Sequence, residues 1–174
     1  MKLSSLYDLL VAELQEIYDA EQQIVVALPE LATAAESQDL AEGFNEHLEQ
    51  TQGQIYRLEE IAAELGIELS GHQCLGLAGI IKEGGELAKI DRSLLRDLAL
   101  IGVAKRVEHY EMARYENARM LAEAMEQDDV ADLLQETLDE EESSDRILSE
   151  AAETIMSDLD DMEVDNEQNV LASS

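Results

Sequence analysis

One stretch of the sequence decides how the rest is interpreted: Val107-Glu108-His109-Tyr110-Glu111-Met112-Ala113-Arg114-Tyr115. It lies inside a long helical pattern in which residues spaced by three or four share one face, namely Leu98, Ile101, Ala104, Glu108, Glu111 and Tyr115. Two glutamates therefore interrupt an apolar or aromatic face. Because an unpaired buried carboxylate is costly, this pair must be protonated, salt-bridged or bound to a metal.

The composition of the chain predicts a single all-helical domain. The 174 residues are 45% hydrophobic but only 3% aromatic, with one proline, and Ala, Leu and Glu dominate. A single cysteine, Cys74, excludes an internal disulfide. No apolar run reaches the roughly 20 residues that span a bilayer, and residues 1–6 lack a signal-peptide core. We therefore expect a cytoplasmic protein that does not enter a membrane.

The charge is strongly acidic, with 41 acidic and 11 basic residues and a formal net charge of −30. Such a field repels nucleic acid and anionic membrane surfaces, so neither is an expected partner. The acidic residues are spread along the whole chain. This distribution favours a halophilic protein in a high-salt cytoplasm, where salt screens the self-repulsion. A cation-storing surface is the alternative interpretation.

Helix caps and apolar spacing predict four long helices over about residues 6–35, 40–65, 91 or 93 to 126, and 130–157. Residues 66–91 hold six of the nine glycines and are predicted to form a long crossover with a short helix at about 73–83. The second and third helices would then run parallel. The predicted architecture is an all-α four-helix bundle over residues 1–157. Residues 158–174 form an acidic tail that is predicted to be disordered.

Polar side chains interrupt the middle of the inward face of every predicted long helix. They are Glu21 on the first, His47 with Thr51 and Gln54 on the second, Glu108 and Glu111 on the third, and Glu141 and Asp145 on the fourth. Glu21 precedes Ser37 by 16 residues and Gln54 follows it by 17, so the two are level along their helices. The same count around Gln127 makes the acids of the last two helices level.

A bundle centre lined by carboxylates and one histidine suits iron or manganese, often as a carboxylate-bridged pair. We expect a dinuclear metal site with Glu21, His47, Glu108, Glu111, Glu141 and Asp145 as ligands. His109 follows Glu108 directly and so points away from it, and it is expected to be a surface or packing residue. In the alternative interpretation the acids fix the helix register and pair with Arg57, Arg106 or Arg114.

Segments in all four helices resemble the YciF-type ferritin-like family, also called YciE/YciF ferroxidases. The segments are 13–23, 44–54, 107–115 and 137–148, and the likeness extends over about residues 4–155. The resemblance implies a ferritin-like bundle, a homodimer, a di-iron site and a link to stress responses. Ferritin-like di-iron sites ordinarily carry Glu-x-x-His on two helices. Here Phe44 stands where the first glutamate would be, and Asp145 stands where the second histidine would be.

These observations lead to two main hypotheses. In the first, the protein binds two metal ions and oxidises Fe(II) with dioxygen or peroxide in stress or iron homeostasis. In the second, it is a non-enzymatic structural or stress-response homodimer whose metal site is vestigial. Manganese-dependent removal of peroxide is a third hypothesis, which the identity of the metal would separate from the first.

Overall fold

The computed structural model describes the backbone of residues 4–172 and the side chains up to residue 162. The five helices are α1 (Leu6–Ala34), α2 (Gln38–Leu65), α3 (Leu75–Leu87), α4 (Leu94–Ala124) and α5 (Asp128–Ala172). Ser5, Ser37 and Ser93 cap α1, α2 and α4, each accepting a hydrogen bond from the backbone N–H three residues later. Gly66 ends α2 in the left-handed conformation with φ 65°. Local capping therefore explains why most boundaries lie close to the predicted ones.

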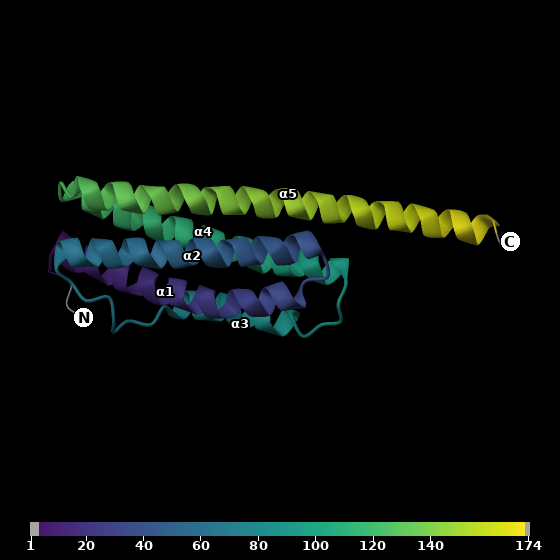
Figure 1. Cartoon of the computed structure of the whole chain (residues 1–174), viewed down its shortest axis with the longest axis horizontal. Helices are drawn as coiled ribbons and strands as arrows, with labels where there is room; N and C mark the ends of the chain where they lie inside the picture. The colour runs from purple at the N-terminus through teal and green to yellow at the C-terminus, as the bar shows by residue number, and fades with distance from the viewer. Residues whose placement is uncertain (1–3, 173–174) are drawn as a thin grey trace.

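The predicted all-α bundle is confirmed. α1 and α2 form one antiparallel hairpin and α4 and α5 form another. The crossover that connects α2 to α4 contains α3 and runs along the outer side of the bundle beside α1 (Figure 1). As a result α2 and α4 point in the same direction. α3 packs against α1 and α4. No helix among residues 4–172 is both long enough and apolar enough to cross a membrane.

The core consists of two apolar clusters with a polar layer between them. One cluster lies near the α4–α5 turn and includes Leu14, Leu58, Leu121 and Leu134. The other lies toward the α1–α2 turn and includes Ile24, Leu28, Phe44, Leu77, Leu100, Ile101 and Ile155. In each long helix the inward acidic or amide residues fall between the two clusters. The middle of the bundle is therefore polar although it is as buried as the ends.

A buried aspartate fastens α4 to the α1–α2 turn. Asp97 is fully buried and its carboxylate accepts hydrogen bonds from the backbone N–H of Glu36 at 2.9 and 3.1 Å and of Ser37 at 2.7 Å. The neighbouring Arg96 donates to the carbonyl oxygen of Ile90 at 2.7 Å and to that of Ala34. These contacts satisfy backbone groups that the turn leaves without helical partners.

The C-terminal segment differs from its sequence prediction. The sequence predicts a disordered tail from residue 158, whereas α5 continues to Ala172 and extends past the other helices (Figure 1). Leu159 packs against the apolar cluster that contains Ile155. The inward face of α5 therefore continues one turn beyond the predicted end of the bundle. Residues 173 and 174 lie outside the described part of the chain.

Candidate metal centre

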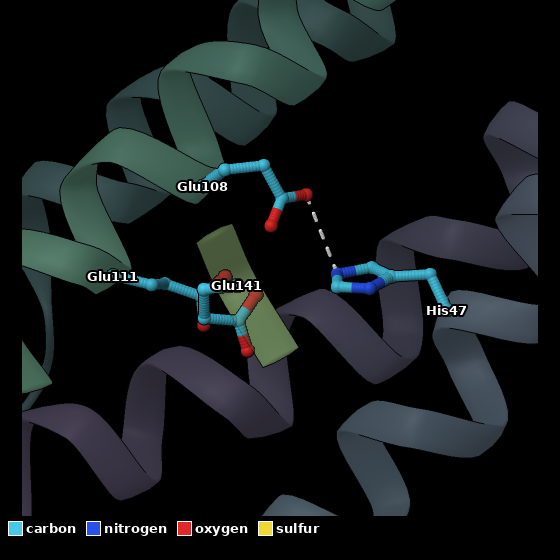
Figure 2. Close-up of side chains that lie close together, drawn as sticks. All are labelled: His47, Glu108, Glu111 and Glu141. Carbon is cyan, nitrogen blue, oxygen red and sulfur yellow. Dashed lines mark ion pairs between the residues drawn. The ribbon is translucent and has the colours of Figure 1, made fainter. Parts of the chain in front are cut away.

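Four of the predicted ligands meet at the centre of the bundle. Glu108 and Glu111 lie one turn apart on α4, Glu141 comes from α5 and His47 from α2. One ligand atom from each of the four lies within 4.8 Å of the others. Figure 2 shows the carboxylates and the imidazole around one shared space. The level positions inferred from the sequence therefore hold in three dimensions.

Glu21, from α1, adjoins this group. Its side chain is fully buried, and its Oε1 accepts a hydrogen bond from the phenol of Tyr115. The carboxyl groups of Glu21 and Glu111 are close enough to share a proton. We call Glu21, His47, Glu108, Glu111 and Glu141 the central cluster. All four helices of the bundle contribute to it.

The central cluster leaves many buried ligand atoms without hydrogen-bond partners. Its four glutamates are at most 3% exposed. The atoms without a partner are Oε2 of Glu21, Glu108 and Glu141, both carboxylate oxygens of Glu111, and Nε2 of His47. That imidazole nitrogen is 3.5 Å from Oε1 of Glu108, too long for a strong hydrogen bond. Buried charges are normally paired or bound to a metal, so the cluster has the character of an incomplete coordination shell.

Basic side chains do not neutralise these acids. Arg57 pairs with Glu140 and Glu136, Arg106 pairs with Glu83 at 3.2 Å, and Arg114 pairs with Glu13 at 2.6 Å and with Glu16. Over residues 4–162, no Lys or Arg forms an ion pair with a glutamate of the central cluster. The register-fixing interpretation named these three arginines, and the structure gives each of them a different acidic partner.

Burial and mutual repulsion change the protonation of the central cluster. Burial, with the charge of Glu141 as the second cause, raises the pKa of Glu21 to about 8, although the Tyr115 hydrogen bond opposes this shift. Burial also raises the pKa values of Glu108 and Glu111 well above their ordinary value, and neighbouring carboxylates add to the effect. Without a cation, the cluster therefore retains protons near neutral pH, and a bound cation would displace them.

A surrounding set of hydrogen bonds orients the cluster. Gln54 Nε2 donates to Glu141 Oε1 and, at 3.2 Å, to Glu140 Oε2. Residues behind the ligands commonly fix ligand orientation in metal sites. Sequence reasoning missed the bond between Tyr115 and Glu21. The available signal was the position of Tyr115, four residues after Glu111 on the same face of α4.

Asp145 is the one predicted ligand that the structure does not bring into the cluster. Its Oδ1 lies 2.8 Å from Lys105 Nζ and 3.1 Å from His109 Nε2, and both partners are on α4. Asp145 therefore lies on the side of α5 that faces α4, where these two basic groups complete its contacts. His109 is 62% exposed, so of its two predicted positions it occupies the one at the surface.

A family model and a known protein both match most of the chain. A family model described as a domain of unknown function, DUF892, matches residues 5–159. Protein YciF of Escherichia coli (strain K12) is 36% identical over 154 residues, which cover 87% of this chain and 93% of YciF.

Solved structures show the same similarity. The crystal structure of the E. coli stress protein YciF matches with a TM-score of 0.86 and 34% identity, covering 89% of this chain and 99% of that one. YcfI from Rhodopseudomonas palustris, described as a candidate structural protein, matches with a TM-score of 0.82 and 39% identity, covering 85% and 95% of the two chains. A protein from Xanthomonas campestris pv. campestris is 19% identical with a TM-score of 0.72, a likeness of fold alone.

Proposed function

The chain belongs to the DUF892 family, which confirms its YciF-type resemblance, and from this premise we propose that it binds two divalent metal ions at the centre of its bundle. One observation carries the proposal. Five side chains from four helices converge there, and six of their buried oxygen and nitrogen atoms lack a hydrogen-bond partner. Two divalent cations would offset the buried negative charge that the protein itself leaves uncompensated. The residues that would hold them form the central cluster defined above.

The donor set favours particular metals. Carboxylate oxygens are hard ligands that suit manganese, and one imidazole beside several carboxylates is also compatible with iron. Iron is our first choice and manganese the second. Gln54 and Tyr115 would keep Glu141 and Glu21 in their binding orientation, because each is hydrogen-bonded to the carboxylate concerned.

We propose oxidation of Fe(II) by dioxygen or peroxide as the reaction, in stress or iron homeostasis. Fe(II) is the substrate. Two Fe(II) ions would give up one electron each, and these two electrons with two protons would reduce dioxygen to hydrogen peroxide, or hydrogen peroxide to water. The role of the chain is electrostatic: the carboxylates stabilise the more highly charged Fe(III) product. Glu21, Glu108 and Glu111 release the protons they hold at neutral pH as the cations bind.

A second function is a structural or stress-response role without turnover. The description of YcfI as a candidate structural protein and of YciF as a stress protein favours it. In this case the acids of the central cluster remain protonated and hydrogen-bonded to one another, and the metal site is vestigial. A homodimer is part of both proposals.

Elemental analysis by plasma mass spectrometry tests the proposal. Protein purified in high salt without chelator is analysed before and after anaerobic loading with Fe(II), and we expect close to two ions per chain. The double variant Glu108→Gln/Glu141→Gln should lose both ions. A control with the same charge change, Glu60→Gln/Glu153→Gln, alters two exposed glutamates and should keep them. Retention of two ions by the first variant would overturn the assignment, and wild-type protein with no more metal than that variant would favour the structural role.

A further inference from the structure

An apolar cavity of about 160 Å³ lies beside the central cluster. Side chains from all five helices contribute to its lining, and its walls include Leu28, Phe44, Val107 and Leu148. His47, Gln50, Glu108 and Ser144 also line the cavity and lie close to one another, and we call this group its polar end. Two of these residues, His47 and Glu108, also belong to the central cluster. The cavity therefore leads from an apolar space to the candidate metal centre.

Small residues keep this space open. Gly43 on α2, Gly85 on α3, Ala104 on α4 and Ala151 on α5 all line the cavity. A Cβ atom added at Gly43 or Gly85 would meet no atom within 4 Å. Protein interiors are normally packed with few voids larger than a water molecule. The space is therefore larger than ordinary side-chain packing leaves, and it can hold a small molecule.

The polar end has unused hydrogen-bonding capacity. Glu108 is 2% exposed and its Oε2 has no partner. His47 Nδ1 lies 3.4 Å from both Gln50 Oε1 and Ser144 Oγ, and Ser144 Oγ lies 3.3 Å from Gln50 Oε1. These contacts are long, so a ligand oxygen placed among them would gain stronger bonds than it displaces.

We infer that the cavity binds a neutral small organic molecule that has an apolar body and one hydroxyl-type head, with the head directed to His47 and Glu108. An apolar cavity of about 150 Å³ accommodates benzene, so the body has about six to eight carbon atoms. The acidic residues Glu30, Asp39 and Glu46 also line the cavity, and they would repel an organic anion. The same acids would attract an organic cation, but its charged head would lose its hydration among the apolar walls, and this cost opposes the attraction.

Binding in this cavity does not require a metal. One consequence rests on the proposed function: the hydroxyl-type head of the ligand would lie against the metal centre. The substrates that reach that centre would then be small, neutral and hydroxyl-bearing rather than only dioxygen or hydrogen peroxide.

Calorimetric titration of benzyl alcohol into the chelator-treated full-length protein tests the inference. We expect saturable binding of one molecule per chain, and we expect benzoate and benzylamine to bind at least tenfold more weakly. Equal binding of the three compounds, or no binding of benzyl alcohol, would overturn it. The metal content of untreated protein, measured separately, keeps this result distinct from the outcome for the dinuclear site.

Two glycines of α2 provide a matched pair of variants. Gly43→Leu places a side chain at the cavity, whereas Gly53 does not line the cavity and has equally open space around it. Both changes favour the helix. We expect Gly43→Leu to weaken benzyl alcohol binding at least tenfold and Gly53→Leu to leave it unchanged. Ala104→Leu, which fills the cavity from α4, should repeat the loss.

The same variants identify a different occupant. If a second copy of the chain covered the cavity, Gly43→Leu would change the molecular mass in solution, and benzyl alcohol would not bind to the wild-type protein. That result would also overturn the inference. Circular dichroism and thermal melting establish that each variant is folded before it is compared.

Discussion

Two buried acidic regions of the bundle differ in how their carboxylates are satisfied. Asp97, next to the α1–α2 turn, is fully buried and accepts three short contacts from the backbone N–H groups of Glu36 and Ser37. Glu111, in the central cluster, is 3% exposed, and neither of its oxygens accepts a hydrogen bond from an N–H or hydroxyl group. The fold therefore supplies hydrogen-bond donors to the buried carboxylate of Asp97, but not to that of Glu111 at the centre of the bundle. The central cluster is built to receive protons or cations.

The largest expected effect of a single substitution comes from Asp97→Asn. The amide offers only one oxygen to backbone groups that are all donors, and its own NH2 group faces them. We expect the free energy of unfolding to fall by about 4 kcal/mol, as for other buried charged contacts that lose a partner. Urea denaturation measures this. Asp97 lies 11 residues before Glu108, about 16 Å along α4, so metal content should not change. A loss of metal without a loss of stability would contradict the distinction between Asp97 and the central cluster.

The second effect is a dependence of stability on pH in the metal-free protein. Glu21 has an ordinary pKa of 4.5 when unfolded and a pKa of about 8 when folded. Between these values the folded protein binds more protons than the unfolded chain, so raising the pH destabilises the folded state. Stability should be full below about pH 4.5 and fall by up to about 1.4 kcal/mol per pH unit for each such group until about pH 8.

Urea denaturation of chelator-treated protein in high salt, from about pH 5 to pH 8, measures this dependence. Glu21→Gln should make the decline shallower, because the group that causes it no longer titrates. Saturation with a divalent metal should reverse the trend, since metal binding displaces protons and is favoured at higher pH. A decline of equal slope in wild type and Glu21→Gln would show that general charge repulsion causes it.

Glu111→Gln should have a smaller effect of opposite sign to Asp97→Asn. Wherever wild-type Glu111 is ionised, the amide removes a buried charge, so the metal-free variant should gain stability, by about 2 kcal/mol for full ionisation. Because burial raises the pKa of Glu111, less of it is ionised at pH 5 than at pH 8, and the gain should be smaller at pH 5. Thermal melting at the two pH values measures both effects. A stability loss at pH 8 as large as that of Asp97→Asn would mean that Glu111 has partners in solution that complete its shell.

The smallest expected effect is that of Asp145→Asn. Asp145 is held by Lys105 and His109 at a partly exposed position, and such pairs contribute about 0.5 kcal/mol. We expect little change in melting temperature and an unchanged metal content of two ions per chain. Loss of one ion in this variant alone would restore Asp145 to the ligand set that the sequence predicts.

Much of the fold could be predicted because its signals are local. Ser5, Ser37, Ser93 and Gly66 mark helix ends by capping chemistry that acts over three or four residues. The 3.6-residue period then placed the central cluster on inward faces, and counting from the turns gave its depth. The bundle itself was recovered in the same way, whereas the family was identified from the resemblance of four sequence segments to known members.

The remaining features depend on contacts between helices, which periodicity does not specify. Asp145 lies four residues after Glu141, close to the same helix face, and only the approach of Lys105 and His109 from α4 determines that it turns away from the cluster. Asp97 was not assigned to the predicted inward face of its helix. It is buried because the crossover brings the α1–α2 turn against it, which the sequence around Asp97 does not encode.

The contact of Asp97 also bears on the order of folding. Its hydrogen bonds connect Asp97 to Glu36 and Ser37, which lie 61 and 60 positions earlier in the chain. Each helical hairpin, by contrast, closes through a turn of a few residues. Closing a long segment costs entropy, so this contact should form after the hairpins and after the transition state. In stopped-flow experiments, Asp97→Asn should accelerate unfolding and leave the folding rate nearly unchanged. The buried aspartate would then govern how long the native bundle lasts and have little influence on how fast it forms.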